Sequence, residues 1–157
     1  LMIELRKRAL SFVNLVPEKE DVPLHERVNR AKQTAKEYPN KTPVFLSIHA
    51  NWFRDSSVTG IEVYTSPGET LSDRIANEFY LKLKNMGWEM RPGTGHPDKE
   101  AKFYVLWETP MPAVLIEHGF FSNEDQARKL LDPEIQRTFA RLEAEAAKKC
   151  ERKVKKW

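Results

Sequence analysis

Residues 111–123 read Met-Pro-Ala-Val-Leu-Ile-Glu-His-Gly-Phe-Phe-Ser-Asn, and this stretch decides the fold prediction. Ala113 to Ile116 is an uninterrupted apolar run, which is typical of a strand buried on both faces of a parallel sheet. Glu117 follows the run directly. A carboxylate beside a core is costly unless it has a partner or a task. We therefore expect Glu117 at the tip of a buried strand, in a functional site.

A second apolar run, from Val44 to Ile48, ends in a histidine in the same way. Ligands of open α/β sheets bind beyond the carboxyl ends of the strands, where both His49 and Glu117 are expected. A lone histidine after a strand is more often a hydrogen-bonded structural residue. The two strand ends together predict a catalytic edge.

Helical and extended patterns alternate along the rest of the chain. Apolar residues at helical spacing follow Pro23, Ser66-Pro67-Gly68-Glu69 (a capping box) and Asp132-Pro133, and Gly87 is a plausible left-handed terminator. We expect helices over about 1–8, 23–38, 66–87 and from 132 onward, and strands over 10–16, 44–48, 61–64, 103–107 and 113–116. This alternation predicts an α/β fold, a single domain whose mostly parallel central sheet is flanked by helices on both faces. The first helix has no cap, so we expect the domain to be N-terminally incomplete.

Composition favours a soluble, globular protein. The chain has 157 residues, of which 40% are hydrophobic and 31% charged, and none of its apolar runs approaches the roughly 20 residues of a membrane span. The formal net charge of +3 is concentrated at the C-terminus, where residues 141–157 carry seven Lys or Arg against three Glu. We therefore divide the chain into a domain over 1–147 and a basic helix end over 148–157. The tail lacks a recognisable nucleic-acid module, so no nucleic-acid partner is expected.

Two compositional features leave the compartment open. The one cysteine, Cys150, cannot form an intramolecular disulfide and has no metal-ligand spacing around it. No charged-then-apolar leader opens the sequence, so no signal peptide is visible.

Four motifs in order resemble a known family. They are Ser-Ile-His-Ala-Asn at 47–51, Gly-Ile-Glu-Val-Tyr at 60–64, Phe-Tyr-Val-Leu at 103–106 and the Met-Pro to Ser-Asn segment at 111–123. Each motif is weak alone, but together they resemble zinc-dependent N-acetylmuramoyl-L-alanine amidases over nearly the whole chain. Residues 24–31 also resemble the Leu-x-x-Arg helix that precedes the Ser-Ile-His strand in that family.

The resemblance implies that His49 is a ligand of Zn²⁺ and that Glu117 is the catalytic carboxylate. The implied reaction cleaves the amide between the lactyl group of N-acetylmuramic acid and L-alanine in peptidoglycan. These implied roles agree with zinc chemistry. A catalytic zinc needs about three protein ligands and an open position, and a nearby carboxylate can take a proton from water and return it to the leaving amine. Such an enzyme acts in the cell wall, the periplasm or outside the cell, as a bacterial autolysin or a phage endolysin.

The resemblance does not extend to two of the zinc ligands of the family. In the family, a histidine of an Asp-x-Gly-His-Gly loop and a glutamate on the next helix lie upstream of the region that matches Leu1. His25, His96 and His118 do not match these positions, and solvation or packing is the better account of each. Two interpretations stay open for Trp52 and Phe53, which either line a sugar or peptide groove or pack in the core. Two also stay open for Arg91, which either binds a peptide carboxylate or is a solvated loop residue.

Two alternatives stay open on these residues. One is a non-catalytic peptidoglycan-binding or regulatory domain that kept the groove and lost its metal centre. The other is a site completed by a separate polypeptide packed against the sheet. A missing neighbouring strand would expose edge hydrogen-bonding groups, and that predicts poor stability or association.

Overall fold

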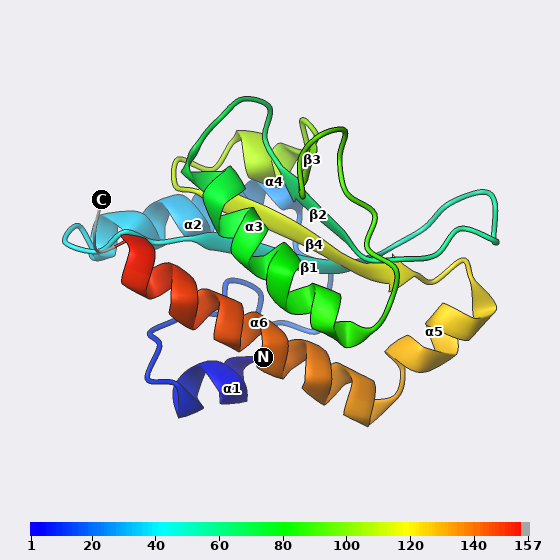
Figure 1. Ribbon diagram of the computed structural model, residues 1–157. Coiled ribbons are helices and arrows are strands. Elements are labelled where there is room, and N and C mark those ends of the chain that lie inside the picture. The colour runs from blue at the N-terminus through cyan, green and yellow to red at the C-terminus, as the bar shows by residue number, and fades with distance from the viewer. Residues whose placement is uncertain (155–157) are drawn as a thin grey trace.

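A four-stranded sheet forms the centre of the molecule (Figure 1). The computed structural model describes residues 1–154, with side chains as far as Glu151. The strand order is β1-β4-β2-β3, with β4 parallel to β1 and antiparallel to β2, and β2 parallel to β3. The strands are β1 (Phe45–Asn51), β2 (Glu62–Thr65), β3 (Lys99–Glu100) and β4 (Ala113–Phe120). Two of the three pairings are parallel, which confirms the predicted mostly parallel sheet.

Helices cover both faces of this sheet, as predicted (Figure 1). Helices α3 and α6 pack together over one face, and α2 and α4 lie over the other. The helices are α1 (Met2–Lys7), α2 (Leu24–Glu37), α3 (Leu71–Leu83) with the 3-10 turn η1 (Lys84–Met86), α4 (Tyr104–Trp107), α5 (Glu124–Leu130) and α6 (Pro133–Val154). No helix in the described part of the chain has the length and apolarity needed to cross a membrane.

The alternation of side chains along β4 divides the core into two layers. Val114 and Ile116 belong to the cluster formed with α3 and α6, and Ala113 and Leu115 belong to the cluster with α2 and α4. Successive strand residues point to opposite faces, so Glu117 continues the second set. The central strand therefore carries its carboxylate on the α2 and α4 side.

The predicted helix spacing is confirmed in the largest core cluster. Ile75, Phe79 and Leu83 on α3, and Phe139 and Leu142 on α6, are buried together. Gly87 ends the α3–η1 segment in the left-handed conformation with φ of 76°. The predicted capping box of Ser66 and Glu69 is wrong, because Thr70 and Asp73 form the box four residues later. Gly68 has φ of 103°, which keeps the Ser-Pro-Gly-Glu segment out of the helix.

The predicted strand over 103–107 is wrong, because this segment forms α4. The backbone N–H groups of Trp107 and Glu108 donate to the carbonyls of Phe103 and Tyr104, each over 2.9 Å. Val105 and Leu106 face the core while Trp107 is exposed. A short apolar run has the same appearance in a buried strand and in a single helical turn.

The predicted strand over 10–16 is also wrong, because this segment is irregular. Leu15 packs against the cluster of α2 and α4, and its carbonyl accepts a hydrogen bond of 2.8 Å from Arg30 Nη1. A side chain thus satisfies a backbone group that a strand would have paired in a ladder.

Helix α5 is not among the predicted helices, although Asn123 caps it by accepting from the Gln126 N–H.

Candidate functional site

The strand register brings three titratable residues into one row across the sheet. His49 on β1 is paired with Glu117 on β4, and Glu117 is paired with Glu62 on β2. Paired residues of neighbouring strands point to the same face, so all three lie on the α2 and α4 side. The predicted neighbours His49 and Glu117 therefore meet. Glu117 lies inside β4 rather than at its tip, because the strand continues to Phe120.

Glu117 is buried without a complete set of hydrogen bonds. Glu117 is 9% exposed, and among the described residues its Oε2 atom has no hydrogen-bond partner. Burial, together with the charge of Glu62, raises the pKa of Glu117 from its ordinary value of 4.5 to about 7. A carboxyl group with this pKa exchanges protons readily near neutral pH.

Glu62 has the opposite environment. Its Oε1 atom accepts from Lys99 Nζ over 2.6 Å and from Arg91 Nε over 3.1 Å, and its Oε2 atom accepts from Asn51 and Tyr64. Burial alone would raise its pKa, but the hydrogen bonds from Lys99 and Asn51 hold the pKa of Glu62 below its ordinary value. When neighbouring carboxyl groups have pKa values pushed apart, the one with the raised pKa is the candidate acid or base. That group is Glu117.

His49 is oriented by the hydroxyl group of its own strand. Ser47 Oγ lies 2.7 Å from His49 Nε2, since residues 47 and 49 share one face of β1. Burial first, and then the charges of Arg27 and His118, lower the pKa of His49 below its ordinary value of 6.5. The imidazole is therefore neutral at pH 7, which is the form that binds a metal ion.

Because Glu117 is buried, we predict that replacing it with an uncharged residue raises the free energy of unfolding, by an amount that depends on pH. Because the folded-state pKa is raised, the native protein binds more protons than the unfolded chain between pH 4.5 and 7, so its free energy of unfolding falls across this window. In metal-free protein, we expect Glu117→Gln to raise the free energy of unfolding by up to about 3 kcal/mol at pH 8. Urea unfolding followed by tryptophan fluorescence measures this. An equal gain at pH 4 would contradict the explanation.

A bulge follows the titratable row and is held by α5. The register between β1 and β4 shifts after His49, and Gly119 has φ of 138°. The buried Gln126 side chain lies over it, and its Oε1 atom accepts from the N–H groups of Phe120 at 2.8 Å and Gly60 at 3.3 Å. Gln126 thereby ties the end of β4 to the start of β2, two residues before Glu62. No local sequence pattern indicates this contact.

The other singled-out histidines lie away from the row. His25 and His96 are exposed, which confirms the expectation of solvation. His118 stacks on Phe139 at 3.9 Å between ring centroids, and its Nε2 lies 2.6 Å from Glu143 Oε1 on α6. This confirms a packing role on the opposite face from Glu117. Within the residues that the structure describes, no three His, Cys, Asp or Glu side chains gather closely enough to hold a metal ion.

The remaining candidates are placed as follows. Trp52 and Phe53 are exposed rather than packed in the core, and Arg91 is bound to Glu62 instead of being free in a loop. At the start of the basic helix end, Lys148 pairs with Glu151 and Lys149 with Glu78. The side chains after Glu151 lie outside the described residues.

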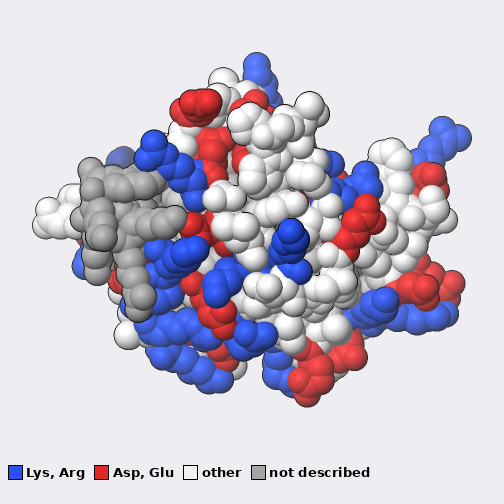
Figure 2. Space-filling model, viewed as in Figure 1, with Lys and Arg blue, Asp and Glu red and all other residues white. Residues whose placement is uncertain are grey.

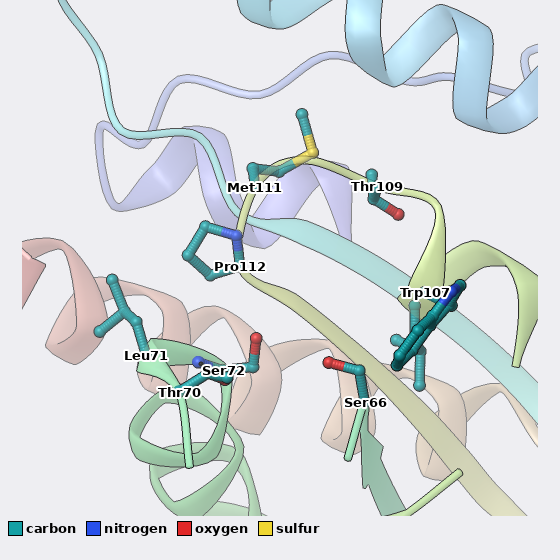
Figure 3. A pocket seen from close by; sticks show the side chains of 9 residues that line it. Ser66, Thr70, Leu71, Ser72, Trp107, Thr109, Met111 and Pro112 are labelled. Carbon is teal, nitrogen blue, oxygen red and sulfur yellow. Dashed lines mark hydrogen bonds between the residues drawn. The ribbon is translucent and has the colours of Figure 1, made fainter. Parts of the chain in front are cut away.

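A separate cavity of about 400 Å³ lies at the other end of β4. Figure 3 shows Trp107 on one side of it and Leu71, Met111 and Pro112 on the other. Met111 and Pro112 directly precede β4, whereas Glu117 lies toward the far end of that strand. The cavity is therefore not part of the titratable row.

Comparison with known proteins gives a family match over almost the whole chain. Residues 3–149 match the Amidase_3 family of N-acetylmuramoyl-L-alanine amidases. The amidase LytC of Bacillus subtilis is 39% identical over 110 residues, which are 68% of this chain and 20% of LytC. The amidase CwlM of Bacillus licheniformis is 35% identical over 76% of this chain and 43% of its own length. The chain thus spans less than half the length of these two relatives.

Solved structures agree with this match. The catalytic domain of the amidase CwlV from Bacillus (Paenibacillus) polymyxa superposes with a TM-score of 0.74 at 26% identity, covering 94% of this chain and 78% of that domain. The amidase AmiC2 of Nostoc punctiforme gives a TM-score of 0.72 at 27% identity, covering 98% of this chain and 77% of that one. The α/β architecture described above is the architecture of amidase catalytic domains.

Proposed function

Since the chain belongs to the N-acetylmuramoyl-L-alanine amidase family, we propose that it hydrolyses the amide bond between the lactyl group of N-acetylmuramic acid and L-alanine in peptidoglycan. The observation that carries this proposal is the pairing of His49 with Glu117, whose Oε2 atom is buried without a hydrogen-bond partner. A buried polar atom of this kind is costly unless a ligand or substrate completes it. The cell wall is the proposed place of action.

The chemistry assigned to Glu117 is proton transfer. Its carboxylate takes a proton from the attacking water, whose oxygen forms a bond to the amide carbonyl carbon. When the C–N bond breaks, the same carboxyl group returns the proton to the leaving amine, so that the products are a lactyl carboxylate and a free alanine amino terminus. The raised pKa suits both roles near neutral pH.

Zinc is the proposed cofactor, with His49 as one ligand. The neutral imidazole of His49 fits one ligand position of a zinc site, and the unpartnered Glu117 carboxyl group lies beside it as the proton-transfer group. Further donors that would complete the ligand set are absent from the described residues around them. When bound, zinc supplies a Lewis acid that polarises the scissile carbonyl and lowers the pKa of water. Ser47 orients the His49 ring toward this role.

The proposed reaction is tested with purified full-length protein and peptidoglycan sacculi. We expect new free amino groups, identified as N-terminal alanine by dinitrophenylation and mass spectrometry. New reducing sugar ends without new amino termini would indicate a glycosidase and contradict the proposal.

Replacing His49 tests the metal assignment. We expect His49→Ala in the full-length protein to lose bound zinc, measured by plasma mass spectrometry, and to lose more than about 100-fold in activity. His96→Ala removes an exposed histidine from a loop and serves as the matched control. Unchanged zinc content in the His49 variant would remove it from the ligand set.

A second candidate function is supported by one observation. The titratable row gives one imidazole beside a carboxylate and lacks the further donors of a catalytic zinc among the described residues. A non-catalytic peptidoglycan-binding domain built around the same titratable row is consistent with this. Sacculi that bind the full-length protein, with no release of amino termini in the presence of added zinc, would favour that function over hydrolysis.

A further inference from the structure

Three large aromatic side chains are exposed just beyond the carboxyl ends of β1 and β4. Trp52 is 58% exposed, Phe53 52% and Phe121 54%. We call this set the aromatic rim. Figure 2 shows largely uncharged surface along the loop that follows β1, with charged side chains toward its tip. Aromatic side chains exposed together are a common feature of ligand-binding surfaces.

Hydrogen bonds hold the two segments of the rim together. The Phe121 N–H donates to the Asn51 carbonyl over 2.9 Å, and the Phe53 N–H donates to Ser122 Oγ over 3.1 Å. Farther along the loop, Asn123 Nδ2 donates to the Ser56 carbonyl over 2.8 Å. Both segments lie at the same end of the sheet in Figure 1. The rim is therefore formed before any ligand binds, which lowers the entropy cost of binding.

The rim follows the row of titratable residues along β1 and β4. Trp52 is three residues after His49, and Phe121 is four residues after Glu117. At about 3.3 Å per residue, these separations correspond to roughly 10 to 13 Å along the strands. A substrate whose scissile amide lies at Glu117 thus reaches the rim with its lactyl group and its sugar ring together.

The side of the row toward β2 and β3, across the sheet from β1, is cationic. Lys99 and Arg91 both bind Glu62, and their side chains are 26% and 34% exposed. Both cations donate to the same oxygen atom, Glu62 Oε1, and both side chains stay partly open to solvent, where a ligand can reach them. Partly exposed cations of this kind bind carboxylates through charge-assisted hydrogen bonds.

We propose that the aromatic rim and the cationic side of the row together set the direction in which peptidoglycan binds. This inference rests on the proposed function. The muramic acid ring stacks on the aromatic rim, and the stem peptide runs toward Lys99 and Arg91. The scissile amide joins the lactyl group of an uncharged pyranose, which has apolar C–H faces, to a peptide that carries free carboxylates. Aromatic faces suit the first part of the substrate and cations suit the second.

Two matched ligands test the sugar half of the proposal. One is a muramoyl-peptide, and the other is the same peptide acylated with D-lactate, which keeps the amide and lacks the sugar. We expect Trp52→Ala and Phe121→Ala, made in the full-length protein, each to weaken the Kd for the muramoyl-peptide by about tenfold. The Kd for the lactyl-peptide should stay unchanged. Equal weakening for both ligands, or for neither, would overturn the rim assignment.

Trp107→Ala is the matched control, since Trp107 is 54% exposed but lies at the other end of β4. It should leave both Kd values unchanged.

For the cationic side of the row, amidating the free carboxylates of the stem peptide should weaken binding to wild-type protein by about fivefold. An unchanged Kd would overturn the peptide half of the assignment.

Turnover of both ligands, recorded alongside binding, separates the two proposals. Selective binding of the muramoyl-peptide that depends on Trp52, without hydrolysis, would support the rim and contradict the proposed function. Hydrolysis without discrimination between the ligands would support the function and overturn the rim.

Discussion

Glu117→Gln in the zinc-loaded, full-length protein is expected to lower kcat by about a thousandfold while leaving zinc content and substrate affinity unchanged. Glutamine keeps the shape of the side chain and cannot accept or return a proton, and positioned acid–base groups typically contribute factors of about 100 to 10,000. Steady-state kinetics on a soluble muramoyl-peptide, with metal analysis of the same sample, measures the effect. Loss of kcat together with loss of zinc would point to a ligand role instead.

Glu143→Gln is the matched control for this experiment. Glu143 is 1% exposed and lies on α6, where it contacts His118 on the opposite face of the sheet from Glu117. Its replacement changes a buried carboxylate of the same size, so kcat should stay near the wild-type value. A comparable loss of kcat in this variant would mean that disturbed folding, rather than lost proton transfer, explains the Glu117 result.

Gly119→Ala is expected to destabilise the protein by about 3 kcal/mol and to reduce activity strongly. The backbone of Gly119 has φ of 138°, and an added Cβ atom would lie 2.8 Å from Gln126 Oε1. Strain of this kind costs about 1 to 3 kcal/mol, and displacement of Gln126 breaks its two buried hydrogen bonds. Thermal unfolding and kinetics on the same preparation measure the two effects.

Gly68→Ala separates strain from collision. Gly68 has φ of 103°, but nothing lies within 4 Å of the added Cβ atom, so its replacement carries strain alone. We expect it to cost less stability than Gly119→Ala and to leave activity unchanged. An equal loss of stability in the two variants would show that contact with Gln126 contributes little.

The elements that the sequence predicted correctly are those with a long or strict pattern. The stripe of Ile75, Phe79 and Leu83 and that of Phe139 and Leu142 extend over several turns, and tertiary packing agrees with them. The five residues from Phe103 to Trp107 are too short for a period to show, so strand and helix could not be separated. The irregular segment before Pro17 depends on Arg30, a contact 15 residues away.

The candidate site was predicted in part for a similar reason. His49 and Glu117 each end an apolar run, and this local pattern placed both at one edge. Glu62 stands in the Gly-Ile-Glu-Val-Tyr motif, but no local pattern places it in the site, because its neighbourhood depends on the antiparallel pairing of β2 with β4. The two partners whose hydrogen bonds lower its pKa most, Asn51 and Lys99, lie 11 and 37 residues away in sequence. Such non-local pairing leaves no periodic signal.

The division of β4 between two layers makes its length more critical than its composition. Glu117 and His118 are neighbours in the chain, yet one faces the titratable row and the other packs on Phe139. Insertion or deletion of one residue between Ala113 and Ile116 would exchange their faces, directing the carboxylate into the apolar layer of α3 and α6. Apolar residues of similar volume are interchangeable within this segment, whereas the count of four between Pro112 and Glu117 is fixed by the chemistry at its end.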